Sequence, residues 1–88
     1  MSKLINVGFG NIVNSDKIIA IIMPDSAPAK RLMQNAKKMG TSIDATHGRK
    51  IQSCLIMEGS QVVFSALTPE TIMDRFQNGI AQRGDVKK

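Results

Sequence analysis

The spacing of apolar residues changes along the chain, and each change marks an expected element. Lys3–Val7 (KLINV) suits a short first strand in which Leu4 and Ile5 face opposite sides, and the following GFGN interrupts that strand. Lys17–Met23 (KIIAIIM) is an almost unbroken aliphatic run. Because this run is too short for a helix and too apolar for a half-exposed strand, we expect a central strand or a strand at an interface.

A helix is expected after this strand. Pro24 ends the strand, Asp25 or Ser26 can cap a helix, and Pro28 is tolerated in a first turn because the N–H that it lacks would have no partner there. Gly40 suits the position just after the last turn. The helix has one apolar stripe at steps of three and four residues: Ala29, Leu32, Met33, Ala36 and Met39.

Three further strands are expected after the helix, arranged as a meander. Residues 42–46 (SIDAT) and 51–57 (IQSCLIM) are joined by His47-Gly48, which resembles the Asn-Gly pair of a type I′ hairpin turn. Residues 61–67 (QVVFSAL) follow Gly59-Ser60, where a glycine at the first central position favours a type II′ turn.

These elements predict one α+β domain over residues 1–78, with about five mostly antiparallel strands and two helices. The second helix is expected in TPETIMDRF, with Thr68 as its N-cap and Pro69 as its first residue. Residues 79–88 offer little to bury, so we expect them to form a disordered basic tail.

Length and composition favour self-association. The chain has 88 residues, of which 42% are hydrophobic but only 3% aromatic, so its core depends on aliphatic side chains and methionine. A chain of this size buries a modest area alone and often gains burial by oligomerising. The longest apolar run is far shorter than the ~20 residues of a membrane span. With no apolar leader and a lone Cys54, which cannot form an intrachain disulfide, a cytoplasmic protein is expected.

Positive charge is concentrated in the middle of the chain. The net charge is +5, and residues 17–50 carry seven cations against two carboxylates, which also gives +5. This distribution favours a polyanionic partner such as nucleic acid, although a solvated helix face explains it equally well. Because there are three Phe and no Trp or Tyr, stacking of unpaired bases is disfavoured and double-stranded DNA is the better candidate.

Catalytic and metal-binding patterns find little support. His47 is the one histidine and lies in an expected turn, so its pairing with Cys54 of the adjoining strand would be chance. One His and one Cys with scattered carboxylates do not form a metal site. GFGN lacks the third glycine and the following helix of a dinucleotide-binding loop. We therefore expect a non-enzymatic protein with no metal, no cofactor and no small-molecule substrate.

Four motifs occur in a specific order over about Ile5 to Phe76: NVGFGNIV, PDSAPAKR, IDATHGRK and TPET. Together they resemble the RemA family of bacterial extracellular matrix regulatory proteins. The resemblance implies a DNA-binding transcriptional regulator of biofilm matrix genes and of osmoprotection. It also implies a fold similar to LytTR DNA-binding domains and a homo-oligomeric ring, with an octamer expected, around which duplex DNA bends.

The same resemblance implies which residues bind DNA. The family's paired arginines after TYG fall on Arg49 and Lys50, and its basic residue beyond GNIV falls on Lys17. This chain has His47 where the family usually has Tyr, and lysine at two of the three basic positions. Phosphate contacts should therefore persist better than bidentate contacts with bases. Pro28 matches the SAP motif and is expected at a packing or subunit surface.

Lys30, Arg31 and His47 are further candidates for DNA contacts. Two other classes of protein stay open from the residues alone. One is an interaction module whose basic face binds an acidic protein, and the other is a small-molecule enzyme subunit that uses the GFGN loop. A mobility-shift assay on long duplex DNA separates the first class from a DNA-binding protein.

Overall fold

Strands and helices alternate irregularly through residues 4–77, the part of the chain that the computed structural model describes. These residues form six strands, two α-helices and one 3-10 helix, η1: β1 (Leu4–Asn6), β2 (Ile12–Asn14), η1 (Ser15–Lys17), β3 (Ile18–Ile22), α1 (Ala27–Met39), β4 (Ser42–Asp44), β5 (Ser53–Met57), β6 (Val62–Ser65) and α2 (Pro69–Gln77). The expected α+β class is confirmed, with six strands in place of about five. The expected tail, residues 79–88, lies outside the described residues.

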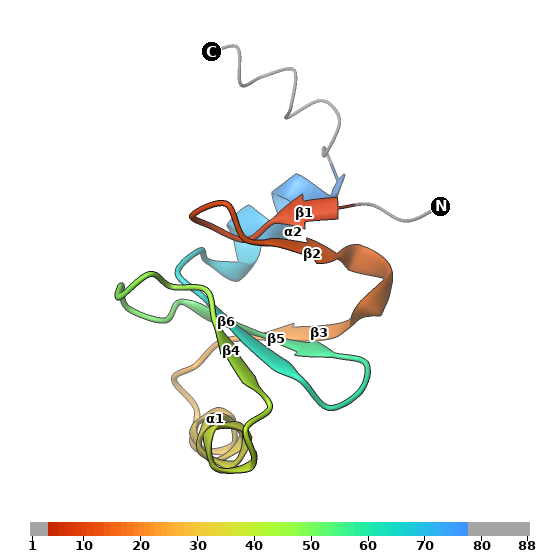
Figure 1. Ribbon diagram of the computed structural model, residues 1–88. Coiled ribbons are helices and arrows are strands. Elements are labelled where there is room, and N and C mark those ends of the chain that lie inside the picture. The colour runs from red at the N-terminus through yellow and green to blue at the C-terminus, as the bar shows by residue number, and fades with distance from the viewer. Residues whose placement is uncertain (1–3, 78–88) are drawn as a thin grey trace.

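The strands form two sheets, a β1–β2 hairpin and a four-stranded sheet in the order β3-β5-β6-β4 (Figure 1). The pairs are antiparallel except β4 and β6, which are parallel. The expected meander is therefore wrong, because β6 lies between β4 and β5. Residues 45–52 are long enough to cross the end of β6, whereas hairpin connections are usually of two to five residues.

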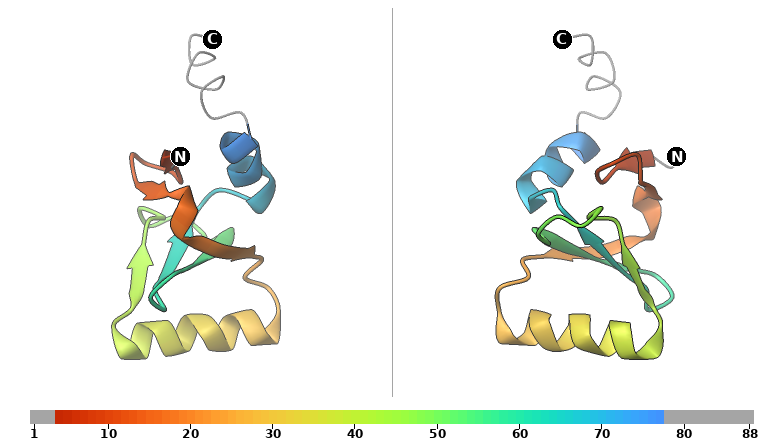
Figure 2. Two further views of the ribbon diagram at one scale, coloured as in Figure 1. Left: turned by 90° about the vertical axis from the view of Figure 1, so that its right-hand side faces the viewer. Right: turned by 60° about the vertical axis from the view of Figure 1, so that its left-hand side comes forward.

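The four-stranded sheet separates two apolar cores. Side chains alternate across it, so that Cys54 and Phe64 face α1 while Leu55 and Val63 face the opposite side. On that opposite side the β1–β2 hairpin and α2 cover the sheet, with Ile72 of α2 fully buried. Figure 2 shows these three layers, with α1 below the sheet and the hairpin and α2 above it.

GFGN does not merely interrupt a strand. It forms the turn of the β1–β2 hairpin, in which Val7 N donates to Asn11 O (2.8 Å) and Asn11 N donates to Gly8 O (2.9 Å). Phe9 and Gly10 at the two central positions have φ of 53° and 80°, the signs that define a type I′ turn. The sequence reasoning missed β2 because its three residues, with no alternation to read, are too short to give a pattern.

The expected helix ends are confirmed. Ser26 Oγ accepts from Ala29 N, Gly40 has a φ of 73° after the last turn of α1, and Thr68 Oγ1 accepts from Thr71 N at the start of α2. The expected stripe on α1 is wrong at Met39, the last residue of the helix, which is 77% exposed. No helix within residues 4–77 combines the length and apolar character needed to cross a membrane.

Two other local expectations change. Within residues 4–77, β3 pairs with β5 alone and is an edge strand, so the expected central position is wrong. The expected interface position stays a prediction, and Ile19 of β3 is exposed. After β5, both Gly59 and Ser60 have positive φ, at 87° and 69°. The expected type II′ turn has positive φ only at its first central residue, so this turn is of the I′ kind instead.

Candidate nucleic-acid interface

The segment that carries Arg49 and Lys50 is a loop anchored at both ends to β6. Ala45 N donates to Phe64 O (2.8 Å), and Gln52 N donates to Ser65 O (2.8 Å). Between these two bonds the chain leaves β4, the parallel neighbour of β6, and passes the end of β6. It then enters β5, the antiparallel neighbour of β6. We call residues 45–52 the crossing loop; it lies on the left of Figure 1. Its two anchors fix where the basic residues emerge from the sheet.

Hydrogen bonds within the crossing loop set its shape. Asp44 Oδ1 accepts from Thr46 N (2.9 Å) and from Thr46 Oγ1 (2.6 Å), and Arg49 N donates to Thr46 O (2.9 Å). His47 and Gly48 have φ of 54° and 81°, so the expected type I′ turn is confirmed even though it joins no hairpin. The turn places His47 and Arg49 at the exposed tip.

The Asp44 carboxylate is stabilised by this arrangement. The hydrogen bond from the Thr46 hydroxyl, followed by that from the Thr46 backbone and by the charge of Lys37, holds the pKa of Asp44 below its ordinary value of 3.8. Asp44 is therefore ionised at neutral pH and keeps accepting both bonds. Asp44 is an acidic residue next to a basic loop, and its two hydrogen bonds with Thr46 stabilise the turn at the start of the crossing loop.

The crossing loop and the GFGN turn meet, although they are far apart in the sequence. The rings of Phe9 and His47 are stacked, with centroids 5.1 Å apart and an interplanar angle of 20°. The Arg49 guanidinium carbon lies 5.5 Å from the centroid of the Phe9 ring, within the range of a cation–π contact. Sequence reasoning treated these two motifs separately and missed Phe9. The signal that was available is a large aromatic residue between two glycines in a turn.

Arg49 and Lys50 are both exposed and lie before the first residue of β5. The rule that consecutive strand residues face opposite sides does not apply to them, because neither is in a strand. Among residues 4–77, no carboxylate lies within ion-pair distance of either side chain. Both charges are therefore available to a partner.

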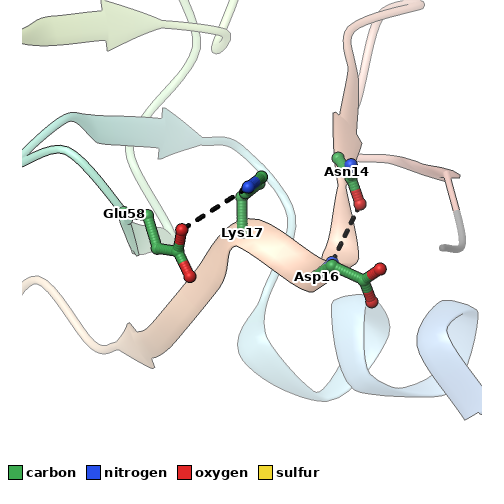
Figure 3. A network of polar contacts seen from close by, with 4 residues as sticks. All are labelled: Asn14, Asp16, Lys17 and Glu58. Atoms are coloured by element: carbon green, nitrogen blue, oxygen red, sulfur yellow. Dashed lines mark hydrogen bonds and ion pairs between the residues drawn. The ribbon is translucent and has the colours of Figure 1, made fainter.

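Lys17 lies elsewhere. It ends η1, its carbonyl accepts from Glu58 N (2.8 Å), and its Nζ lies 3.5 Å from Glu58 Oε1 (Figure 3). Glu58 follows β5, whereas Arg49 precedes it, so the length of β5 separates them. At about 3.3 Å per residue, the five residues of β5 alone span ~16 Å. One subunit therefore does not bring the three expected DNA-binding residues together.

The remaining candidates lie on α1. Lys30 and Arg31 are exposed on its first half, and Pro28 is exposed in its first turn. Because α1 covers the face of the sheet opposite the β1–β2 hairpin, these cations and the Phe9 ring lie on different layers. His47 alone of the additional candidates adjoins Arg49 in the crossing loop.

Cys54 is fully buried under α1, and this burial raises the pKa of its thiol, which disfavours the reactive thiolate. Within the described residues, no three His, Cys, Asp or Glu side chains are grouped so that they could hold a metal ion. Cys54 is therefore part of the apolar core, and Asp44 holds the turn of the crossing loop.

The fold and the loop define a small α+β protein that presents a basic, doubly anchored loop beside an exposed aromatic ring. The chain belongs to the RemA-like family, described as extracellular matrix regulatory protein A-like, whose model matches residues 4–76. It is 57% identical to a protein of Lachnoclostridium phytofermentans over 75 residues, covering 85% of this chain and 82% of that protein. Its identity to a protein of Fervidobacterium nodosum is 53% over 76 residues, covering 86% and 82% of the two chains. Both relatives carry the name "Putative regulatory protein".

Proposed function

We propose that this protein is a non-enzymatic transcriptional regulator that binds double-stranded DNA through the crossing loop, with Arg49 and Lys50 contacting the DNA. Membership of the RemA-like family and the regulatory names of its relatives support the regulatory part. The resemblance of the motifs extends the proposal to biofilm matrix genes and osmoprotection, to a LytTR-like mode of binding and to a location in the cytoplasm.

One observation carries the DNA-binding proposal. Arg49 and Lys50 stand next to each other on an exposed loop that is fixed at both ends to the sheet, with no carboxylate near either within residues 4–77. Two cations outside any ion pair of the described residues, on a loop whose backbone is hydrogen-bonded at both ends, can contact phosphates with less ordering of the backbone, so less binding energy is lost.

The proposal includes assembly into a closed ring of identical subunits, with an octamer expected. An apolar groove of about 340 Å³ lies between β3 and α2, and it is lined in part by exposed Ile19, Met73 and Phe76. A soluble subunit gains by covering such a surface, and the unpaired edge of β3 lies beside it. Pro28, exposed on α1, is proposed as a second contact between subunits.

Ring assembly also accounts for the position of Lys17. A ring is built from head-to-tail contacts, in which one end of a subunit meets the opposite end of its neighbour. Lys17 bonds to Glu58, just after β5, and the crossing loop precedes β5, so they lie at opposite ends of that strand. In Figure 1, the segment η1 that ends with Lys17 is on the right and the crossing loop is on the left. We propose that Lys17 of one subunit and Arg49 of the next share one DNA-facing surface, around which the duplex bends.

A mobility-shift assay with a mixed-sequence duplex of about 150 base pairs, one persistence length, tests the function. The parent protein should shift this duplex at low salt, and the Arg49→Ala/Lys50→Ala variant should not. A protein that is folded and assembled but leaves the duplex unshifted would contradict the proposal. It would favour the alternative in which the basic surface binds an acidic protein.

A further inference from the structure

Phe9 occupies a backbone position that its side chain disfavours. Its φ is 53° at the first central position of a type I′ turn, where Asn, Asp or Gly is the usual residue. A bulky side chain at positive φ is uncommon and costs conformational energy. Such a conformation persists only where the surrounding structure enforces it. The requirements of the turn therefore do not explain why a phenylalanine stands there.

The contacts of the ring offer an explanation. Phe9 is 49% exposed as a residue, yet its ring stacks on His47 and its centroid lies 5.5 Å from the guanidinium carbon of Arg49. Phe9 is not part of either buried apolar cluster within residues 4–77, because both clusters are formed by other residues. Within residues 4–77, both of its ring contacts are with residues at the tip of the crossing loop.

The hairpin that carries Phe9 is itself firmly attached. Ser65 Oγ of β6 donates to Val7 O (2.7 Å), Gly8 N donates to Asn6 Oδ1 (2.7 Å), and Arg75 of α2 donates to Asn6 O (2.8 Å). The crossing loop is anchored to the same strand, β6, through Phe64 O and Ser65 O. Both partners of the cation–π contact are therefore fixed to one support.

We propose that Phe9 is a positioning residue that holds the Arg49 guanidinium in a DNA-binding orientation. This inference rests on the proposed function. A guanidinium that lies against an aromatic face keeps its N–H edges free for phosphate or for a guanine base. Ordering this long side chain before binding removes part of the entropy cost of the complex. Within residues 4–77, Lys50 has no such ring contact, so its binding to DNA should not depend on Phe9.

Two substitutions separate the ring from the turn. Phe9→Asn removes the ring but suits the positive φ, so the fold should be at least as stable as that of the parent. Phe9→Tyr keeps an aromatic face and should preserve binding. We expect Phe9→Asn to bind a mixed-sequence DNA duplex about two- to fivefold more weakly per contact, the equivalent of one exposed cation–π interaction.

A double-mutant cycle distinguishes an effect on Arg49 from a general structural effect of Phe9→Asn. In the Arg49→Ala background, Phe9→Asn should have no further effect on DNA affinity, whereas in the Lys50→Ala background its effect should be retained in full. Met39→Gln, which removes an apolar side chain that is more exposed than Phe9 (77% against 49%) and lies at the end of α1, serves as the control and should bind as the parent does. Equal losses from Phe9→Asn in both backgrounds would overturn the proposal.

Side-chain NMR of the protein without DNA tests the contact separately from the function. The δ-methylene and Nε–H protons of Arg49 should show ring-current shifts in the parent and in Phe9→Tyr, and these shifts should be lost in Phe9→Asn. Absence of such shifts in the parent would overturn the positioning role even if DNA is bound. Presence of the shifts in a parent that does not bind DNA would uphold the contact and overturn the proposed function.

Discussion

The three positions proposed to contact DNA carry one arginine and two lysines. Arg49 is the single planar cation of the three proposed contacts, and Lys17 and Lys50 are compact point charges. The guanidinium can donate two parallel hydrogen bonds to the O6 and N7 of guanine, whereas an ammonium group discriminates little between bases. Sequence preference should therefore depend on Arg49 and general affinity on all three.

Alanine substitutions should reveal this division. Arg49→Ala should cost about 1–3 kcal/mol on a preferred sequence, selected from a random pool, and less on mixed-sequence DNA. Lys17→Ala and Lys50→Ala should weaken both kinds of DNA about equally and each lower the salt slope by about one. Affinities of each variant for both duplexes across a salt series measure these effects. Equal losses on the two duplexes for Arg49→Ala would contradict a base-reading role.

If Lys17 contacts DNA as proposed, Glu58 should compete with the DNA for it. The ion pair at 3.5 Å is 58% exposed on both sides, so it contributes only about 0–1 kcal/mol to stability. Glu58→Gln removes a negative charge that also repels phosphate. We expect tighter DNA binding with an almost unchanged free energy of unfolding, measured by titration and by urea denaturation. Unchanged or weaker binding would argue that Lys17 does not meet DNA.

Asp44 should make the crossing loop sensitive to acid. Its folded-state pKa lies below its ordinary value of 3.8, so the ionised form stabilises the fold above pH 3.8, and this contribution is lost as the pH falls through the folded pKa. Asp44→Asn keeps an oxygen acceptor but cannot titrate. Urea denaturation from neutral pH to below 3.8 should show a steeper loss of stability in the parent than in Asp44→Asn. Parallel pH profiles would contradict this role.

At the scale of elements, the sequence predicted the helices and their ends better than it predicted the pairing of the strands. The caps at Ser26, Gly40 and Thr68 act within a few residues, so the sequence alone predicts both helices and their ends. The parallel pairing of β4 with β6 joins segments separated by the whole of β5, and no local pattern encodes it. The His47-Gly48 turn was predicted correctly, yet it was assigned to the wrong connection, because a turn fixes direction over four residues only.

The candidate site shows the same limit. Arg49 and Lys50 are visible in the sequence as adjacent cations after a turn, and the family resemblance assigned them to DNA. The approach of Phe9 to Arg49 results from two loops fixed to the same end of β6, so it follows from the topology and could not be predicted from either motif alone. The distance from Lys17 to the loop likewise follows from β5 lying between them.

Ser65 links the elements that support the site. Its hydroxyl donates to Val7 O and accepts from Leu67 N (3.0 Å), and the residue is fully buried. Ser65→Ala leaves both partners without this bond, so the free energy of unfolding should fall by about 1–3 kcal/mol. Ser42, whose hydroxyl makes no hydrogen bond within residues 4–77, gives the matched control in Ser42→Ala. Equal stability of the two variants in urea would contradict the role of Ser65.

At the scale of the whole molecule, assembly should depend on the apolar groove and on α1. Ile19→Lys places a charge at an edge-strand position that is 66% exposed in the single subunit, so it should lower the mass of the assembly while leaving the fold intact. Pro28→Ser should weaken assembly before it weakens folding. Light scattering and circular dichroism of each variant measure the two properties. A parent that is monomeric at micromolar concentration and still binds DNA would contradict the ring.

The central claim is that DNA binds to the crossing loop, and the salt dependence of binding tests it most directly. Binding of the parent and of Arg49→Ala/Lys50→Ala to a mixed-sequence duplex of about 150 base pairs should be measured across a salt series, with mass and fold confirmed for both. The parent's affinity should fall steeply as salt rises, because each phosphate contact releases counterions, and repeated contacts around a ring multiply the effect. The double variant should bind far more weakly and with a shallower slope. A folded, assembled double variant that keeps the parent's affinity and slope would contradict the claim and place the DNA-binding surface elsewhere, most directly on the cations of α1.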